Sequence, residues 1–293
     1  MPQTLDLRRR MTAVSQTKKI TGAMQIVSST RMKRVVSHIE YNHRYFNTVQ
    51  RTMKELLLSS QDISHPYLDD SRGDRRTCIV ISGDKGLAGD YNSKVLEFAL
   101  QYLQPQEQGG GLVTLGHTAD AFFEARGITP DVSYSGVVQD PTLDRARGML
   151  YDVLRLYETG LADEILVIYT SFYGETKNQP VMRRLLPIKL ADYGDIKQAQ
   201  EISEFLYEPS PQAVFDMLVP QYVLGILFGV LVQAYASEHY ARMTAMQRAT
   251  QNADEMLEQL TVRYHMARQS AITSEIAEIT GAALALSEGG DMQ

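Results

Sequence analysis

The C-terminal part of the chain contains a long stretch in which almost nothing interrupts a helix. No proline follows Pro220, and no glycine lies between Gly229 and Gly281, so the residues that break helices are nearly absent. Ser210 and Pro211 supply a helix cap and a first-turn proline at its start. A helix of about 75 residues reaches on the order of 110 Å, which exceeds the diameter of a compact domain of this size. We therefore expect a rod that projects from its own domain and is covered by other chains.

Apolar and small residues follow one another along this rod at a spacing close to a heptad repeat. The spacing predicts that these residues form the seam of a coiled coil. They are Met246, Ala249, Ala253, Met256, Leu260, Tyr264, Ala267 and Ala271.

A second rod is predicted at the N-terminal end, because residues 4–59 contain no proline. Its apolar residues mostly step by three or four, with slips near Thr17, Ser29 and Asn42, which predict an irregular coil. Two such rods at opposite ends of one chain predict an antiparallel coiled coil. The apolar positions are Leu7, Met11, Val14, Ile20, Met24, Val27, Met32, Val35, Ile39, Phe46, Val49, Met53 and Leu56.

The charge of the chain is unevenly distributed. Residues 1–54 carry a net charge of +9, whereas the whole chain carries −6. A basic helix suits nucleic acid, an anionic membrane or an acidic protein surface. Aromatic side chains are missing from residues 1–40, so stacking on single-stranded nucleic acid is disfavoured and a protein groove fits better.

The segment between the rods alternates strand-like and helix-like runs, which predicts an α/β fold with a mostly parallel, Rossmann-like sheet. We place the domain boundaries at 1–60 for the N-terminal coiled-coil helix, 61–208 for the central α/β domain and 209–293 for the C-terminal coiled-coil helix. The expected strands are 77–83, 112–116, 132–138, 164–172 and about 185–190, and the expected helices are 92–104, 118–126 and 142–159.

One stretch raises the question of a membrane span. Residues 217–237 contain no charged side chain, and Gly225 and Gly229 have the spacing of a helix-packing motif. Pro220, Gln221 and Gln233 shorten the purely apolar run to about eleven residues, fewer than a span needs. We expect a helix buried between another helix and a sheet, with no direct membrane span.

The loop Gly83–Asn92, with the sequence GDKGLAGDYN, stands between a strand and a helix, where α/β enzymes bind phosphate groups. Its glycine spacing matches neither dinucleotide-binding nor P-loop templates, and Asp84 and Asp90 would repel a phosphate. We interpret the loop as a structural turn, with Asn92 near the helix start. The alternative is a nucleotide-binding α/β enzyme with coiled-coil arms, and ATP binding by the isolated chain would distinguish the two.

Other catalytic signals are weak. The six histidines do not pair at metal-ligand spacing, and the one cysteine, Cys78, is expected to be a buried apolar residue in a reducing compartment. Neither a serine nucleophile motif nor a paired acid and base is evident. We expect no catalytic residue, cofactor or metal.

Several segments together resemble the gamma subunit of the F-type rotary ATP synthase, of the bacterial type. The resemblance spans nearly the whole chain. It is carried by TKKITGAMQIVSSTRM, SGDKGLAGDYN, EPSP, ASEHYARMTAM and ARQSAITSEIAEITGAA.

The resemblance implies a central-stalk rotor that couples ion flow through a membrane ring to ATP synthesis or hydrolysis by rotation. The implied partners are the alpha and beta subunits of the catalytic hexamer, the epsilon subunit and the ring of c subunits, at the cytoplasmic face of the cell membrane. Nucleic acid is not among them. The residues that match hexamer-contacting positions are Arg8, Arg9, Lys18, Met24, Arg242, Gln269, Thr273 and Glu275, and Tyr207 matches a position near the ring.

Overall fold

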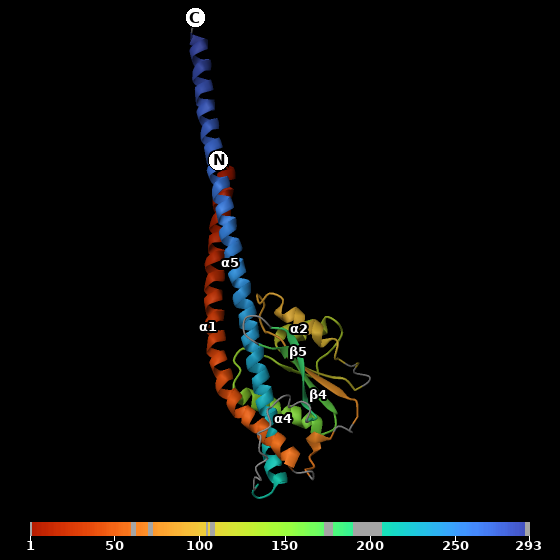
Figure 1. Cartoon of the computed structure of the whole chain (residues 1–293). Helices are drawn as coiled ribbons and strands as arrows, with labels where there is room; N and C mark the ends of the chain where they lie inside the picture. Colours follow the sequence, from red (N-terminus) through yellow and green to blue (C-terminus); the bar gives the residue numbers. More distant parts are fainter. Residues whose placement is uncertain are drawn as a thin grey trace. The chain divides into compact units, whose positions relative to one another are not determined.

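The computed structural model describes residues 2–59, 63–69, 73–103, 105, 109–172, 178–189 and 207–290, without the side chains of 2–3, 37–44, 59 and 283–290. Packing divides the chain into two compact units: the helix pair, 1–27 with 243–293, and the globular unit, 28–242. The elements (Figure 1) are α1 Pro2–Ser59, the 3-10 helix Pro66–Leu68, β1 Arg76–Ile81, α2 Tyr91–Ala99, β2 Gly111–Leu115, α3 His117–Glu124, β3 Val132–Tyr134, α4 Leu143–Glu158, β4 Glu164–Thr170, β5 Pro180–Leu186 and α5 Pro211–Gly290.

The boundaries of these units differ from the three-part division at residues 60 and 208, because each unit contains part of both long helices. The three-part division stays a prediction.

A five-stranded sheet forms the centre of the globular unit, in the order β3-β2-β1-β4-β5. The first four strands are parallel, and β5 pairs with β4 in the antiparallel sense. The central strands β1 and β4 are buried on both faces, which explains why they appear in the sequence as continuous apolar runs. The predicted α/β class and mostly parallel sheet are confirmed.

Several element boundaries differ from the prediction. Helix α2 ends at Ala99 instead of continuing to Gln104, and β3 ends at Tyr134, because Gly136 follows with φ of 74° and leaves the strand region. Strand β5 begins at Pro180, before the predicted start near Leu185. Its pairing with β4 sets this start, and a pairing with a distant strand is not visible in the local pattern.

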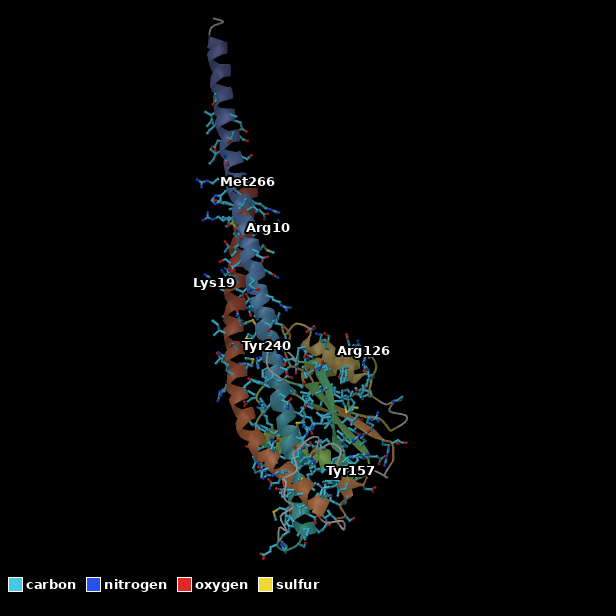
Figure 2. The ribbon with its side chains drawn as sticks, in the orientation of Figure 1. Arg10, Lys19, Arg126, Tyr157, Tyr240 and Met266 are labelled. Atoms are coloured by element: carbon cyan, nitrogen blue, oxygen red, sulfur yellow. The ribbon has the colours of Figure 1, made fainter. Side chains whose placement is uncertain are left out.

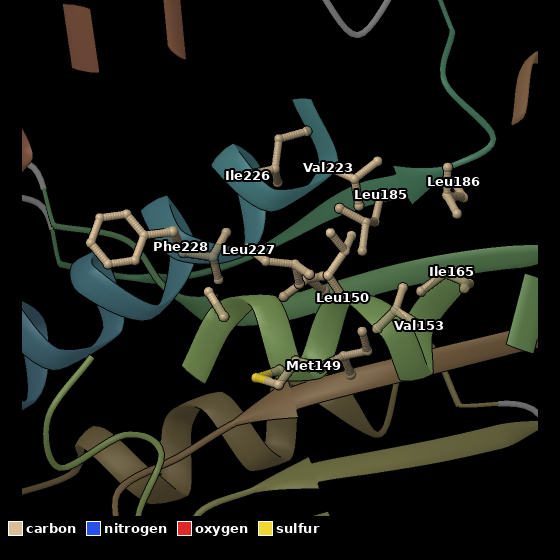
Figure 3. Close-up of a cluster of buried hydrophobic side chains, with 14 of the residues drawn as sticks. Met149, Leu150, Val153, Ile165, Leu185, Leu186, Val223, Ile226, Leu227 and Phe228 are labelled. Atoms are coloured by element: carbon tan, nitrogen blue, oxygen red, sulfur yellow. The ribbon is translucent and has the colours of Figure 1, made fainter. Parts of the chain in front are cut away.

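The start of α5 agrees with the prediction. Ser210 caps it: its side-chain oxygen accepts a hydrogen bond from the backbone N–H of Ala213 at 3.2 Å. By length and composition α5 is apolar enough to cross a membrane. In the globular unit, however, Val223, Leu227 and Leu231 are at most 1% exposed. Figure 3 shows Val223 beside Leu185 of β5 and Leu227 on the side of α5 that faces α4, as expected for a buried helix.

The packing of α1 against α5 in the globular unit depends on a glycine. A Cβ atom at Gly225 would collide with the ring of Phe46, so the missing side chain lets that ring lie on the backbone of α5. Further along α1, Val49, Met53 and Leu56 are buried in the same core.

The helix pair consists of antiparallel segments of α1 and α5. The hydroxyl oxygens of Thr21 and Thr250 lie 2.7 Å apart, and Lys18 forms an ion pair with Asp254. Thr21 pairs with Thr250, and the earlier residue Lys18 pairs with the later residue Asp254, so the two segments run in opposite directions. The predicted antiparallel pairing is confirmed.

The seam of α1 agrees only in part with the apolar residues that were predicted: Leu7, Met11 and Val14 point inward, but other predicted residues do not. Ile20 and Val27 are 60% and 50% exposed, whereas Thr21 is buried, and Lys18 and Gln25 are half-buried. The slip near Thr17 is therefore absent, because the three-and-four spacing continues through polar side chains. The inward positions in the helix pair are Thr4, Leu7, Met11, Val14, Lys18, Thr21 and Gln25.

The seam of α5 also needs one correction. Met256 is 51% exposed, and Leu257 is the half-buried residue of that turn. With Leu257 the steps from Ala253 to Leu260 are four and three, the alternation that keeps a heptad seam facing its partner. Met246, Ala253 and Leu260 are buried, as predicted.

Candidate functional site

The outer surface of the helix pair carries an unusual number of exposed apolar side chains. They do not contribute to the seam, and they alternate with charged residues such as Arg10 and Lys19, which point outward in Figure 2. Exposed apolar surface of this extent marks a site of association with another protein. We call this set the outer apolar face: Leu5, Ile20, Ile26, Val27, Met256, Val262, Met266, Ile272, Ile276 and Ile279.

The end of α5 has no partner helix from α1. The Thr21 and Lys18 contacts set a register in which the first residues of α1 lie opposite α5 residues near 270. Figure 1 shows α5 continuing beyond the N-terminus of α1. Residues 272–282 are all exposed, including Ile272, Ile276 and Ile279. An isolated helix of this kind is marginal in water, so a partner is needed to stabilise it.

The structure brings five of the predicted contact residues to this end of the helix pair. Arg8 and Arg9 are exposed near the start of α1. Gln269, Thr273 and Glu275 are exposed on α5, close to or beyond the point that lies opposite the first residues of α1. The Thr273 hydroxyl donates to the carbonyl of Gln269 at 2.9 Å, which uses its proton within the helix.

Lys18 and Met24 lie further along α1. Lys18 is bound to Asp254 and keeps 40% of its side chain exposed. Met24 is half-buried beside the seam. Neither residue belongs to the cluster at the end of the helix pair.

Arg242 has a different environment, because its side chain lies inside the globular unit and is 8% exposed. Its guanidinium group donates to Glu238 at 2.6 Å and to the carbonyls of Lys85 and Gly86 at 3.2 Å. Arg242 thereby joins α5 to the glycine-rich loop 83–92. We call this arrangement the Arg242 latch.

The groups around Arg242 have shifted ionisation. Burial raises the pKa of Glu238, and the opposing attraction of Arg242 only partly offsets it. Burial, together with Arg242 and Arg31, lowers the pKa of His239 to about 3. His239 is therefore neutral at physiological pH, and its Nδ1 lies 3.4 Å from the Arg242 guanidinium. The latch contains one internal ion pair and a neutral ring.

The latch occupies the place where an α/β enzyme would bind a nucleotide. The chain reverses its strand order between β1 and β4, and loop 83–92 follows β1 at this switch point. The Gly83 N–H is already bonded to Asn92 at 2.8 Å, and a Cβ atom at Gly83 would lie 2.9 Å from the carboxyl carbon of Glu238. A phosphate group here would meet a carboxylate and carbonyl oxygens. The geometry therefore favours a structural turn.

Leu87, at the tip of this loop, was not singled out from the sequence. It has φ of 63°, a conformation that is costly for a bulky residue, and it is 62% exposed. The neighbouring carbonyls are held by Arg242. Its position between Gly86 and Gly89 was a signal of an unusual turn, but the pattern alone does not show which side chain is exposed.

Tyr207 lies immediately before α5 in the globular unit. It is half-buried and packs against the core that contains the first turns of α5. Its phenol ring therefore contributes to the anchoring of that helix start.

The comparisons with known proteins agree with one another. A family model described as ATP synthase matches residues 3–286. The ATP synthase gamma chain of Ruminiclostridium cellulolyticum is 34% identical over 287 residues, covering 96% of this chain and 98% of the relative. The ATP synthase gamma chain of Symbiobacterium thermophilum is 36% identical over 282 residues, covering 96% and 97%.

Among solved structures, the fold is similar to a chain of the Euglena gracilis mitochondrial ATP synthase, OSCP/F1/c-ring, in rotational state 3. The TM-score is 0.71 at 16% identity, and the match covers 100% of this chain and 97% of the other. A chain of the central stalk and c-ring of the Tetrahymena thermophila mitochondrial ATP synthase matches with a TM-score of 0.58 at 21% identity, covering 78% and 99%.

Proposed function

Because the chain belongs to the ATP synthase gamma chain family, we propose that it is the central-stalk rotor subunit of ATP synthase. It couples ion flow through a membrane ring to ATP synthesis or hydrolysis in a hexamer of alpha and beta subunits. The coupling is mechanical: the chain rotates and presents different faces to the catalytic sites. The chain makes and breaks no covalent bond itself.

The observation that supports this role is the distribution of side chains on the helix pair. Polar residues such as Lys18 and Thr21 occupy the seam, while Ile20, Val27 and Ile276 are at least half exposed. A coiled coil that served only its own stability would have the opposite arrangement. The outer apolar face is suited to a surrounding protein sleeve, and apolar contacts lack the directional bonds that would hold one rotational angle.

On the helix pair, the hexamer contacts are proposed at two places. The end of the helix pair contributes Arg8, Arg9, Gln269, Thr273 and Glu275. Lys18 and Met24 provide the second set of contacts, further along α1.

The remaining contacts involve the globular unit, which we propose binds the epsilon subunit and the ring of c subunits at the cytoplasmic face of the cell membrane. Tyr207 is the proposed residue near the ring. Arg242 is retained as a hexamer-contact residue, and the latch gives it an additional role in holding Leu87 at the surface.

A single-molecule rotation experiment tests the proposal. Cys78 is fully buried, and burial raises the pKa of its thiol to about 12, so it does not react with a label at neutral pH. Tyr151 on α4 is 68% exposed, so Tyr151→Cys provides one reactive thiol for a bead. The labelled chain is assembled with its alpha and beta subunits, and the hexamer is fixed to a surface.

We expect the bead to rotate in one direction when ATP is added. The chain with its natural Tyr151 is the control and should attach no bead. Active ATP hydrolysis by the assembly without bead rotation would overturn the proposal. Binding of ATP to the isolated chain at micromolar concentration would instead support the nucleotide-binding alternative.

A further inference from the structure

The globular unit contains a cavity of about 160 Å³, partly open to the surface, where α1, α5 and β5 meet. It includes no residue of loop 83–92 and none of the helix pair. Among the residues that the structure describes, those that line it are Phe46, Asn47, Gln50, Arg183, Tyr222, Gly225, Ile226, Phe228, Gly229, Val232 and Gln233.

Two glycines one turn apart on α5 shape this cavity. At Gly225 the ring of Phe46 occupies the place where a side chain would stand. At Gly229 no atom of the described side chains lies within 4 Å of the position a Cβ atom would take. The first glycine lets α1 approach, and the second leaves empty space beside it.

The walls of the cavity combine aromatic rings with one cation. Phe46, Tyr222 and Phe228 contribute rings. Arg183 lies opposite Val167 in the β4–β5 register, so it lies on the face of the sheet that α5 covers. Among the described residues that line the cavity there is no carboxylate to neutralise the guanidinium group.

The volume restricts what the cavity accommodates. An apolar protein cavity of about 150 Å³ holds one benzene molecule. A guanidinium group binds a carboxylate through two parallel hydrogen bonds. The side-chain amides of Asn47, Gln50 and Gln233 offer further polar contacts. A ligand with one apolar ring and one anionic group matches both the volume of the cavity and the charge of the guanidinium group.

We propose that this cavity binds a small aromatic carboxylate, with its ring among the aromatic side chains and its carboxylate on Arg183. The ligand contacts α1, α5 and β5 together, so its binding stabilises the globular unit. This site is independent of the rotor function proposed above.

The test measures benzoate binding to the purified full chain by ligand-observed NMR and by the shift in thermal unfolding. Benzyl alcohol, which has the ring without the charge, and acetate, which has the charge without the ring, are the comparison probes. We expect benzoate to bind with a Kd on the order of 0.1–1 mM, and acetate at least about tenfold more weakly.

Three variants locate the site. Gly229→Leu fills the empty space and should abolish binding of benzoate and benzyl alcohol. Gly148→Leu is the matched control, because Gly148 is a helical glycine in α4 of the same unit with no atom within 4 Å of its Cβ position; it should leave binding unchanged. Arg183→Gln should weaken benzoate about tenfold and benzyl alcohol less than about twofold.

The proposal is overturned if benzoate fails to bind at about 10 mM, or if Gly229→Leu binds it as the natural chain does. Equal loss in Gly148→Leu would also overturn it. If Gly229→Leu does not fold, the ratio of benzoate to benzyl alcohol affinity in Arg183→Gln decides: an unchanged ratio refutes the site.

Discussion

Replacement of Arg242 by methionine should destabilise the globular unit far more than the loss of an ordinary surface charge. The side chains of Arg242 and Glu238 are each 8% exposed, so the change leaves a carboxylate buried beside an apolar group. Removal of one partner from a buried ion pair costs about 3–5 kcal/mol. That is a large part of the roughly 5–15 kcal/mol by which a typical domain is stable.

Two measurements on the full chain check this expectation. Urea unfolding followed by circular dichroism gives the change in free energy. Limited digestion with trypsin reports the loop, because the Arg242 guanidinium binds the carbonyls of Lys85 and Gly86. Cleavage after Lys85 should therefore become faster in Arg242→Met, even under conditions where the chain stays folded.

Arg147→Met is the matched control. Arg147 forms an ion pair with Asp144 on α4, but the two side chains are 47% and 89% exposed, so its loss should cost less than about 1 kcal/mol. The double replacement of Glu238 by leucine and Arg242 by methionine should recover part of the loss, since no buried charge is then left unpaired. If Arg242→Met costs no more than Arg147→Met, the latch contributes nothing and our reasoning about it is wrong.

Three further predictions concern the cavity, the buried histidine and the seam. Gly229→Ala should stabilise the chain by about 0.5–1 kcal/mol in urea unfolding, because it removes backbone freedom in a helix without a collision. Gly225→Ala should destabilise the chain by about 1–3 kcal/mol, because the new methyl group collides with the Phe46 ring. Shifts of the same sign in the two variants would contradict this. The folded-state pKa of His239, about 3, lies below the ordinary histidine value of 6.5. The unfolded chain therefore takes up the proton first, and the stability that His239 contributes is lost as pH falls from about 6.5 toward 3. Relative to His239→Gln, the natural chain should lose about 2 kcal/mol between pH 7 and pH 5, and a constant difference would refute the assignment. Thr21→Val should cost about 1 kcal/mol through loss of the hydrogen bond between Thr21 and Thr250. The Thr250 hydroxyl still donates to the carbonyl of Met246 at 2.9 Å, so a second change of Thr250 to valine should add little to the loss. Chemical denaturation of the single and double variants measures both, and additive losses would count against the hydrogen bond.

Family resemblance supplied the predicted contact residues of the candidate site, and those contacts stay predictions, whereas the chemical environment of each residue came only from the structure. The exposed positions of Arg8, Arg9 and Glu275 agree with an outward role on the helix pair. Arg242 had the same expected role, yet the structure shows its guanidinium inside the globular unit. Arg183 and Leu87 were missed, because their importance depends on a cavity wall and on a backbone conformation that no sequence pattern displays.

Local chemistry in the sequence determined the lengths of the two long helices, the cap at Ser210 and the α/β class of the central segment. These properties depend on residues that are neighbours along the chain: prolines and glycines, a capping hydroxyl, and apolar runs. They were correct to within a few residues.

Tertiary structure alone decided which residues complete the inward face of each long helix. Periodicity specifies the spacing of a seam but not its phase, so apolar Ile20 and Met256 were the natural choices, and the structure uses Thr21 and Leu257 instead. The choice depends on the energy of pairing with a partner more than two hundred residues away, such as Thr250 for Thr21. A contact of that kind exists only once the chain has folded, and it leaves the apolar residues free for another protein.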